Sequence, residues 1–183
     1  MFKGTASTGL LLAALLLSGG CATTGSRQTS DGWTVNTVQA GASKMKVTWI
    51  TGTPGAPWER DSARTADMAW RNPRLAATIY VDTTCGNKYD DVPLTVLVNH
   101  LTFGFENPVT EEQVELDLAE RGALRRVFSA RLDGRPVKLA STVVKKGPCI
   151  FDLVYATAKP DRFAEGWGAY EAVLEGLAIR VDR

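Results

Sequence analysis

The sequence contains a single histidine, His100, and this scarcity limits the chemistry open to the chain. A metal centre built on several histidines is excluded, and any histidine-based catalytic triad would have to use His100 itself. The Gly-x-Ser-x-Gly motif of a nucleophile elbow and the Gly-x-x-x-x-Gly-Lys-Ser/Thr motif of a phosphate-binding loop are both missing. We therefore expect a protein that is not an enzyme and that uses no cofactor and no metal.

The chain also lacks a charge imbalance and a second long apolar run. It has 21 Lys and Arg residues against 20 Asp and Glu residues, and removing residues 1–20, which include Lys3, leaves 20 of each sign. A neutral balance gives no reason to expect binding to nucleic acid or to anionic headgroups. After residue 20 no apolar stretch approaches the roughly 18 residues of a membrane-spanning helix, so we expect no transmembrane segment in the mature chain.

An export signal is present at the N-terminus. Lys3 supplies its positive charge, and residues 10–17 form an apolar run of leucine and alanine that is too short to span a bilayer. The run ends at Leu17-Ser18-Gly19-Gly20-Cys21, which resembles the lipobox of a bacterial lipoprotein precursor. Ser18 stands where such motifs usually have leucine.

This resemblance implies a diacylglyceryl thioether on Cys21, cleavage before Cys21 and acylation of the new amino group. Several acyl chains would hold the protein on a lipid bilayer essentially permanently. The residue after Cys21 is Ala22 and not aspartate. By resemblance to lipoprotein sorting, this favours the outer membrane, with the protein on its periplasmic face. The alternative is ordinary signal cleavage that leaves Cys21 as an incidental thiol.

Composition divides the chain into three parts. Residues 1–20 are the signal peptide, residues 21–32 are the lipidated cysteine and a flexible tether, and residues 33–183 are one domain. The tether is small and polar, and its roughly 11 residues could extend ~36 Å at most. The remaining length suits one domain with its own core.

Two further cysteines, Cys85 and Cys149, would lie outside the cytosol, where disulfides persist. We predict that they form a disulfide. The alternatives are two separate buried thiols or one reactive thiol.

Alternating apolar residues predict antiparallel strands from residue 33 onward, with tight turns at Asn72-Pro73 and Asp133-Gly134. The segment 149–156 is apolar on both faces apart from Asp152 and is predicted to be a central strand. Two helices are expected, one capped by Asp91 with its apolar stripe reaching residue 105, and one from about residue 160 to 177. The pattern indicates an α+β domain with an antiparallel sheet covered by two helices.

The final third of the chain carries a second resemblance. The hairpin 123–144, the strand 149–156 and the helix that opens at 160–163 resemble the closing segment of PsbP-like domains. This resemblance implies an α/β/α sandwich and a binding role as an adaptor or accessory subunit.

Val96, His100 and Phe103 form a second, semi-apolar face of the first expected helix, opposite its main apolar stripe. Phe103 is too large an apolar side chain to be left in water without a reason. Either a loop of the same chain or a partner protein should cover it. These three residues are the candidate interaction site.

Asp152 needs a partner because a carboxylate in a central strand is partly desolvated. Pairing with an arginine or lysine is favoured, and the alternative is a polar group in a ligand pocket.

Asp82, Asn87, Asp90 and Asp91 gather around Cys85, but their spacing differs from that of a calcium loop, and we expect turn and cap chemistry. A basic hairpin is expected to be a solvated face, or to dock an acidic partner; it carries Arg121, Arg125, Arg126, Arg131, Arg135, Lys138, Lys145 and Lys146.

The leading hypothesis is a membrane-anchored periplasmic lipoprotein that serves as a non-enzymatic adaptor in an envelope complex of transport or motility type. Its partners would be the lipid bilayer, through acylated Cys21, and an envelope protein. One alternative, suggested by the five tryptophans, is a carrier or sensor of an apolar small molecule or lipid, which needs a pocket between sheet and helix. A remote alternative is an enzyme that uses the carboxylates of Asp152 or of residues 82–91.

Overall fold

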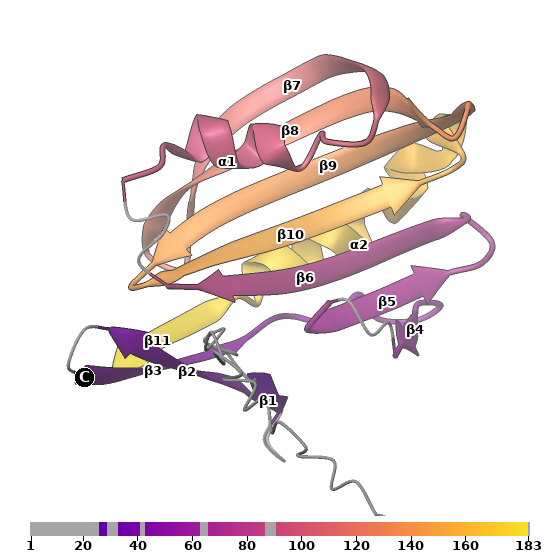
Figure 1. The fold of residues 1–183 in the computed structure, drawn as a ribbon. Coiled ribbons are helices and arrows are strands. Elements are labelled where there is room, and N and C mark those ends of the chain that lie inside the picture. The colour runs from indigo at the N-terminus through magenta and orange to yellow at the C-terminus, as the bar shows by residue number, and fades with distance from the viewer. Residues whose placement is uncertain (1–25, 29–32, 41–42, 63–65, 87–90, 183) are drawn as a thin grey trace, which may run out of the picture.

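The structure is a computed structural model that describes all residues except 1–25, 29–32, 41–42, 63–65, 87–90 and 183 (Figure 1). Its largest element is a seven-stranded antiparallel sheet. The strands are β4 (Glu59–Asp61), β5 (Met68–Asn72), β6 (Ala77–Cys85), β7 (Glu106–Leu118), β8 (Arg121–Leu132), β9 (Arg135–Lys146) and β10 (Cys149–Thr157). They pair in the order β4-β5-β6-β10-β9-β8-β7.

β10 lies at the centre of this sheet, as its apolar sequence predicts. It pairs with β6 on one side and with β9 on the other. The predicted hairpins are also confirmed, because β5 pairs with β6 and β8 pairs with β9. Asp133 and Gly134 join β8 to β9 with φ of 50° and 72°, the left-handed backbone that tight hairpin turns require.

Two helices cover opposite faces of the sheet (Figure 1). α2 (Phe163–Glu175), which follows a 3-10 turn η2 (Pro160–Arg162), buries Tyr170, Val173 and Leu174 in the main core. α1 (Leu94–His100) buries Leu97 and Val98 against the other face, over β8, β9 and β10. The antiparallel α+β architecture with two helices therefore agrees with the sequence.

α1 is shorter than predicted. It ends at His100, and residues 101–104 form turns after it. Its N-cap is Pro93, with no side-chain cap hydrogen bond, where Asp91 was expected. Because α1 spans only seven residues, it covers only part of its face of the sheet. The structure therefore has a smaller helical layer on that face than the predicted sandwich and is rich in strands. In the described ranges no helix is long and apolar enough to cross a bilayer.

A second, four-stranded sheet is not predicted by the sequence patterns. β1 (Ser26–Gln28), β2 (Thr34–Ala40), β3 (Ser43–Ile50) and β11 (Ala178–Asp182) pair in the order β1-β2-β3-β11. Trp49 of β3 meets Phe151 of β10 edge-to-face, with ring centroids 5.7 Å apart, so this sheet shares the main core. β1 falls within the segment expected to be a tether.

The disulfide between Cys85 and Cys149 is confirmed. The two residues lie directly opposite each other on β6 and β10, with Cα atoms 4.0 Å apart and the sulfur atoms bonded. The bond therefore joins one end of the two central strands across a sequence separation of 64 residues.

Candidate functional site

The predicted interaction residues lie together on and just after α1. We call Val96, His100 and Phe103 the α1 surface. The His100 and Phe103 rings meet edge-to-face at 5.9 Å, while Val96 lies one helical turn before His100. The helix packs through its other side, where Leu97 and Val98 are buried.

Phe103 is 82% exposed and Val96 is 41% exposed. Among the residues that the structure describes, no loop of the same chain covers Phe103. The first of the two alternatives, a loop of this chain, is therefore not found there. A side chain of this kind loses contact with water only when another molecule packs on it. The α1 surface is thus an apolar group on a rigid support.

Asp152 lies among carboxylates. Its neighbour across β6 is Asp82, and its neighbour across β9 is Val143, so neither adjacent strand places an arginine or lysine opposite it. Burial raises the pKa of Asp152 to about 7, and the negative charge of Asp82 adds to the rise. Burial also raises the pKa of Asp82, and Asp67 contributes second.

Tyr80 lies next to this pair, two residues before Asp82 on the same face of β6. Burial raises its pKa to about 12, followed by the charges of Asp152 and Asp82. The carboxyl group of Asp152 therefore exchanges a proton near neutral pH. This gives the group a role in how the stability of the fold depends on pH.

The other acidic residues around Cys85 are separated by the fold or lie outside the described residues. Asp82 is on β6 and Asp91 precedes α1, while Asn87 and Asp90 fall in the undescribed segment 87–90. In the described part of the chain, no group of three His, Cys, Asp or Glu side chains is arranged to hold a metal ion.

Three of the eight basic residues of the hairpin, Arg125, Arg126 and Lys138, pair with acidic or polar residues of β7. Arg125 contacts Glu112 at 3.1 Å, and Lys138 contacts Glu111 at 2.5 Å. Arg125 and Lys138 also lie over aromatic rings of α2, those of Trp167 and Phe163. Arg125 and Lys138 are thus half-buried and already paired, so their charges are largely used within the domain and not on a freely solvated face.

Aromatic side chains fill the space between α2 and the sheet. Tyr155 stacks on Phe163 at 4.8 Å and lies 6.0 Å from Tyr170. The Tyr155 hydroxyl donates to the Phe163 carbonyl at 2.9 Å, and Tyr170 is fully buried. A carrier of an apolar ligand would need a pocket between the sheet and α2. These rings fill the middle of that layer, and an open pocket of about 390 Å³ beside them is lined by Val127, Phe163 and Trp167 among other residues.

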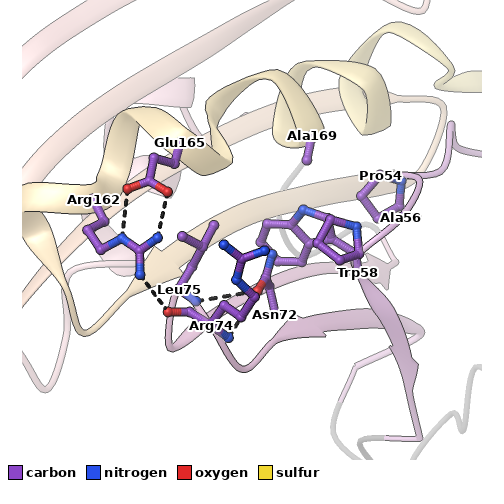
Figure 2. Close-up of a pocket in the computed structure, with 10 residues that line it drawn as sticks. Pro54, Ala56, Trp58, Asn72, Arg74, Leu75, Arg162, Glu165 and Ala169 are labelled. Atoms are coloured by element: carbon purple, nitrogen blue, oxygen red, sulfur yellow. Dashed lines mark hydrogen bonds and ion pairs between the residues drawn. The ribbon is translucent and has the colours of Figure 1, made fainter.

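A pocket that the sequence patterns do not predict lies at the edge of this layer (Figure 2). We call it the Trp58 pocket; its volume is about 360 Å³. It is formed by the loop before β4, the turn between β5 and β6, and the first turns of α2 with η2. Its lining residues are Pro54, Ala56, Pro57, Trp58, Asn72, Arg74, Leu75, Arg162, Glu165 and Ala169. Only the loop character of residues 51–57, with two glycines and two prolines, was visible in the sequence.

Comparison with known proteins identifies a fold and no family. No protein-family model and no curated protein matches the sequence. LpqN of Mycobacterium tuberculosis, described as involved in cell envelope biogenesis, superposes with a TM-score of 0.53 at 15% identity, covering 80% of this chain and 91% of LpqN.

Two other solved structures are similar at lower scores. A protein of unknown function from Pseudomonas aeruginosa has a TM-score of 0.48 at 11% identity and covers 80% of this chain and 97% of its own. The solution structure of cyanobacterial PsbP (CyanoP) from Synechocystis sp. PCC 6803 has a TM-score of 0.49 at 12% identity, covering 89% of this chain and 99% of its own. What the comparisons establish is that this chain shares its fold with LpqN.

Proposed function

We propose that the protein is a periplasmic lipoprotein of the outer membrane that acts as a non-enzymatic adaptor, binding an envelope protein through the α1 surface. The observation that carries this proposal is the exposure of Phe103, which is 82% accessible beside His100 and Val96. Burying a phenylalanine side chain contributes roughly 1.5–3 kcal/mol, so a partner that covers it gains a real share of a binding free energy.

The support beneath this surface favours binding without rearrangement. Leu97 and Val98 fix α1 on the sheet, and the Thr102 hydroxyl donates to the Asn99 carbonyl at 2.7 Å in the turn that leads to Phe103. Arg126 of β8 also donates to the Asn99 side chain. A turn whose backbone is already held in place loses little backbone freedom when a partner packs on it.

The location in this proposal rests on the N-terminal sequence. Cys21 and residues 1–25 lie outside the described residues, so the fold itself does not test the anchor. The envelope role stated for LpqN agrees with a periplasmic protein, but at 15% identity it is a statement about LpqN.

Site-specific photocrosslinking tests the proposal. Benzoylphenylalanine replaces Phe103 in the full-length protein in cells. The matched control carries it at Leu132, an apolar side chain that is 43% exposed at the end of β8. We expect one discrete protein adduct from position 103 and none of that size from position 132. Phe103→Glu should remove the partner from a co-purification, while Leu132→Glu should retain it.

Two outcomes would refute adaptor binding through α1. One is the absence of a protein adduct at position 103 in membranes that contain the acylated protein. The other is an adduct pattern that is the same for positions 103 and 132, which would indicate contact without specificity.

A further inference from the structure

The Trp58 pocket lies on the α2 side of the sheet, so it is separate from the α1 surface. We propose that this pocket binds a small organic monoanion, whose carboxylate pairs with Arg74 and whose apolar body packs against Trp58. The inference does not depend on the adaptor proposal, because the two sites share no residue.

The loop that forms one wall is held directly on α2. The Gly52 amide donates to the Val173 carbonyl at 3.3 Å, and a Cβ atom added at Gly52 would come within 1.9 Å of the Ala172 carbonyl oxygen. The Trp58 amide donates to the Gly55 carbonyl at 3.0 Å. This wall is therefore fixed by backbone contacts before any ligand arrives.

The opposite wall, the β5–β6 turn, is equally constrained. The Asn72 side-chain oxygen accepts from the amides of Arg74 at 3.1 Å and Leu75 at 3.3 Å. The Arg74 carbonyl accepts from Lys159 Nζ at 2.9 Å and from Arg162 at 3.0 Å. The backbone of Arg74 is thus fixed, while its side chain remains available (Figure 2).

The charges that line the pocket do not cancel. Arg162 donates two hydrogen bonds to the carboxylate of Glu165, both at 2.7 Å, and these two groups neutralise each other. Within the described ranges, the Arg74 guanidinium makes no hydrogen bond or ion pair of its own and has only a longer-range attraction to Glu165. One positive charge is therefore left over, and a guanidinium suits a carboxylate because it can donate two parallel hydrogen bonds.

The remaining lining is apolar. Trp58 is half-buried and meets Tyr155 edge-to-face with ring centroids 6.1 Å apart, which leaves part of the indole facing the pocket. Pro54, Leu75 and Ala169 complete the walls. A volume of about 360 Å³ is at the lower end of the range for small-molecule sites, so the ligand is small.

Calorimetric titration of the full-length chain carrying Cys21→Ser, which needs no detergent, tests the inference. The probes are naphthalene-2-carboxylate, its uncharged carboxamide, and acetate, which has the charge without the body. We expect the carboxylate to bind at least about 10-fold more tightly than the other two. Arg74→Gln should weaken binding of the carboxylate by about 10-fold or more and leave the carboxamide unchanged, and Trp58→Leu should weaken both aromatic probes.

The matched control is Arg121→Gln, an exposed arginine at the far end of the sheet, which should bind like the parent. Thermal unfolding of each variant confirms that it is folded. No heat from the carboxylate at millimolar concentration would overturn the proposal, and so would an Arg74→Gln variant that binds it as tightly as the parent. Because no partner protein is present, neither result bears on the α1 surface.

Discussion

Asp152 illustrates what a sequence reveals about a single residue. Its place in an apolar strand indicates that the carboxyl group is desolvated and needs compensation. Which residue lies opposite depends on the register between β10 and β6, two strands that are far apart in the chain. The strand register places Asp82 there instead of an arginine or lysine, and burial together with the charge of Asp82 raises the pKa of Asp152.

Asp152→Asn should change how stability depends on pH. Burial raises the pKa of Asp152 from 3.8 to about 7 on folding, because the ionised carboxyl group is disfavoured in the folded state. The folded state is therefore relatively more stable at low pH, and this advantage is lost as the pH rises through about 7. By linkage this shift is worth at most about 4 kcal/mol. We expect the unfolding free energy of the parent to fall between about pH 4 and pH 7, and the unfolding free energy of Asp152→Asn to fall less over the same range.

Urea unfolding at a series of pH values measures this difference, with Asp117→Asn, an exposed carboxylate on β7, as the control. Above pH 7 the Asp152→Asn variant should be more stable than the parent. Identical pH profiles for Asp152→Asn and the parent would show that Asp152 titrates normally.

The glycines of α2 show how an element depends on its surroundings. They lower the intrinsic helix propensity, so the sequence indicates that packing must stabilise this helix. The structure gives the reason for one of them: a Cβ atom at Gly166 would lie 2.3 Å from the Tyr155 hydroxyl oxygen. Gly168, on the same helix, has nothing within 4 Å of such an atom.

Gly166→Ala and Gly168→Ala should therefore have opposite effects. Alanine favours a helix over glycine by about 1 kcal/mol, so Gly168→Ala should raise the unfolding free energy by up to that amount. Gly166→Ala should lower it by about 1–3 kcal/mol because the new methyl group clashes with Tyr155. Chemical denaturation of both variants measures the two changes, and equal effects would contradict the close contact.

α1 and the Trp58 pocket mark the limits of pattern reading for sites. The sequence groups Val96, His100 and Phe103 because they are close in the chain; α1 ends at His100, so Phe103 meets the His100 ring from the turn that follows the helix. The pocket combines Trp58, Arg74 and Glu165, which belong to three separate segments. No local pattern connects them, since only the packing of α2 on the β5–β6 turn brings them together.

The arrangement of the two sheets depends on the most distant contacts. The hairpins β5–β6 and β8–β9 follow from turn residues and from alternating apolar residues, and both were predicted. β11 pairs with β3, more than a hundred residues earlier, and its five residues carry too little pattern to reveal that partner. The small sheet was therefore missed.

The disulfide should contribute a large part of the domain's stability. Closing a loop of 64 residues corresponds to about 4 kcal/mol in the chain-entropy model, within a usual total of about 5–15 kcal/mol. Cys85→Ala with Cys149→Ala should lower the unfolding free energy by that order, and a reductant should have no effect on this variant. The intact mass of the parent should rise by ~2 Da on reduction, and an unchanged mass would show that the bond is not formed.

Attachment to the membrane should depend on Cys21 alone. The lipobox-like sequence predicts a lipid anchor on Cys21, and after residue 20 the sequence has no second long apolar run that would suggest another anchor. Cys21→Ser should move the protein from the membrane fraction to the soluble periplasmic fraction, while Ala22→Asp should keep it lipidated but shift it away from the outer membrane. Fractionation and the mass of the N-terminal peptide measure both effects.

A Cys21→Ser protein that stays in the membrane fraction would mean that the domain binds the envelope through a protein contact. Repeating the fractionation with Phe103→Glu would show whether that contact is the α1 surface.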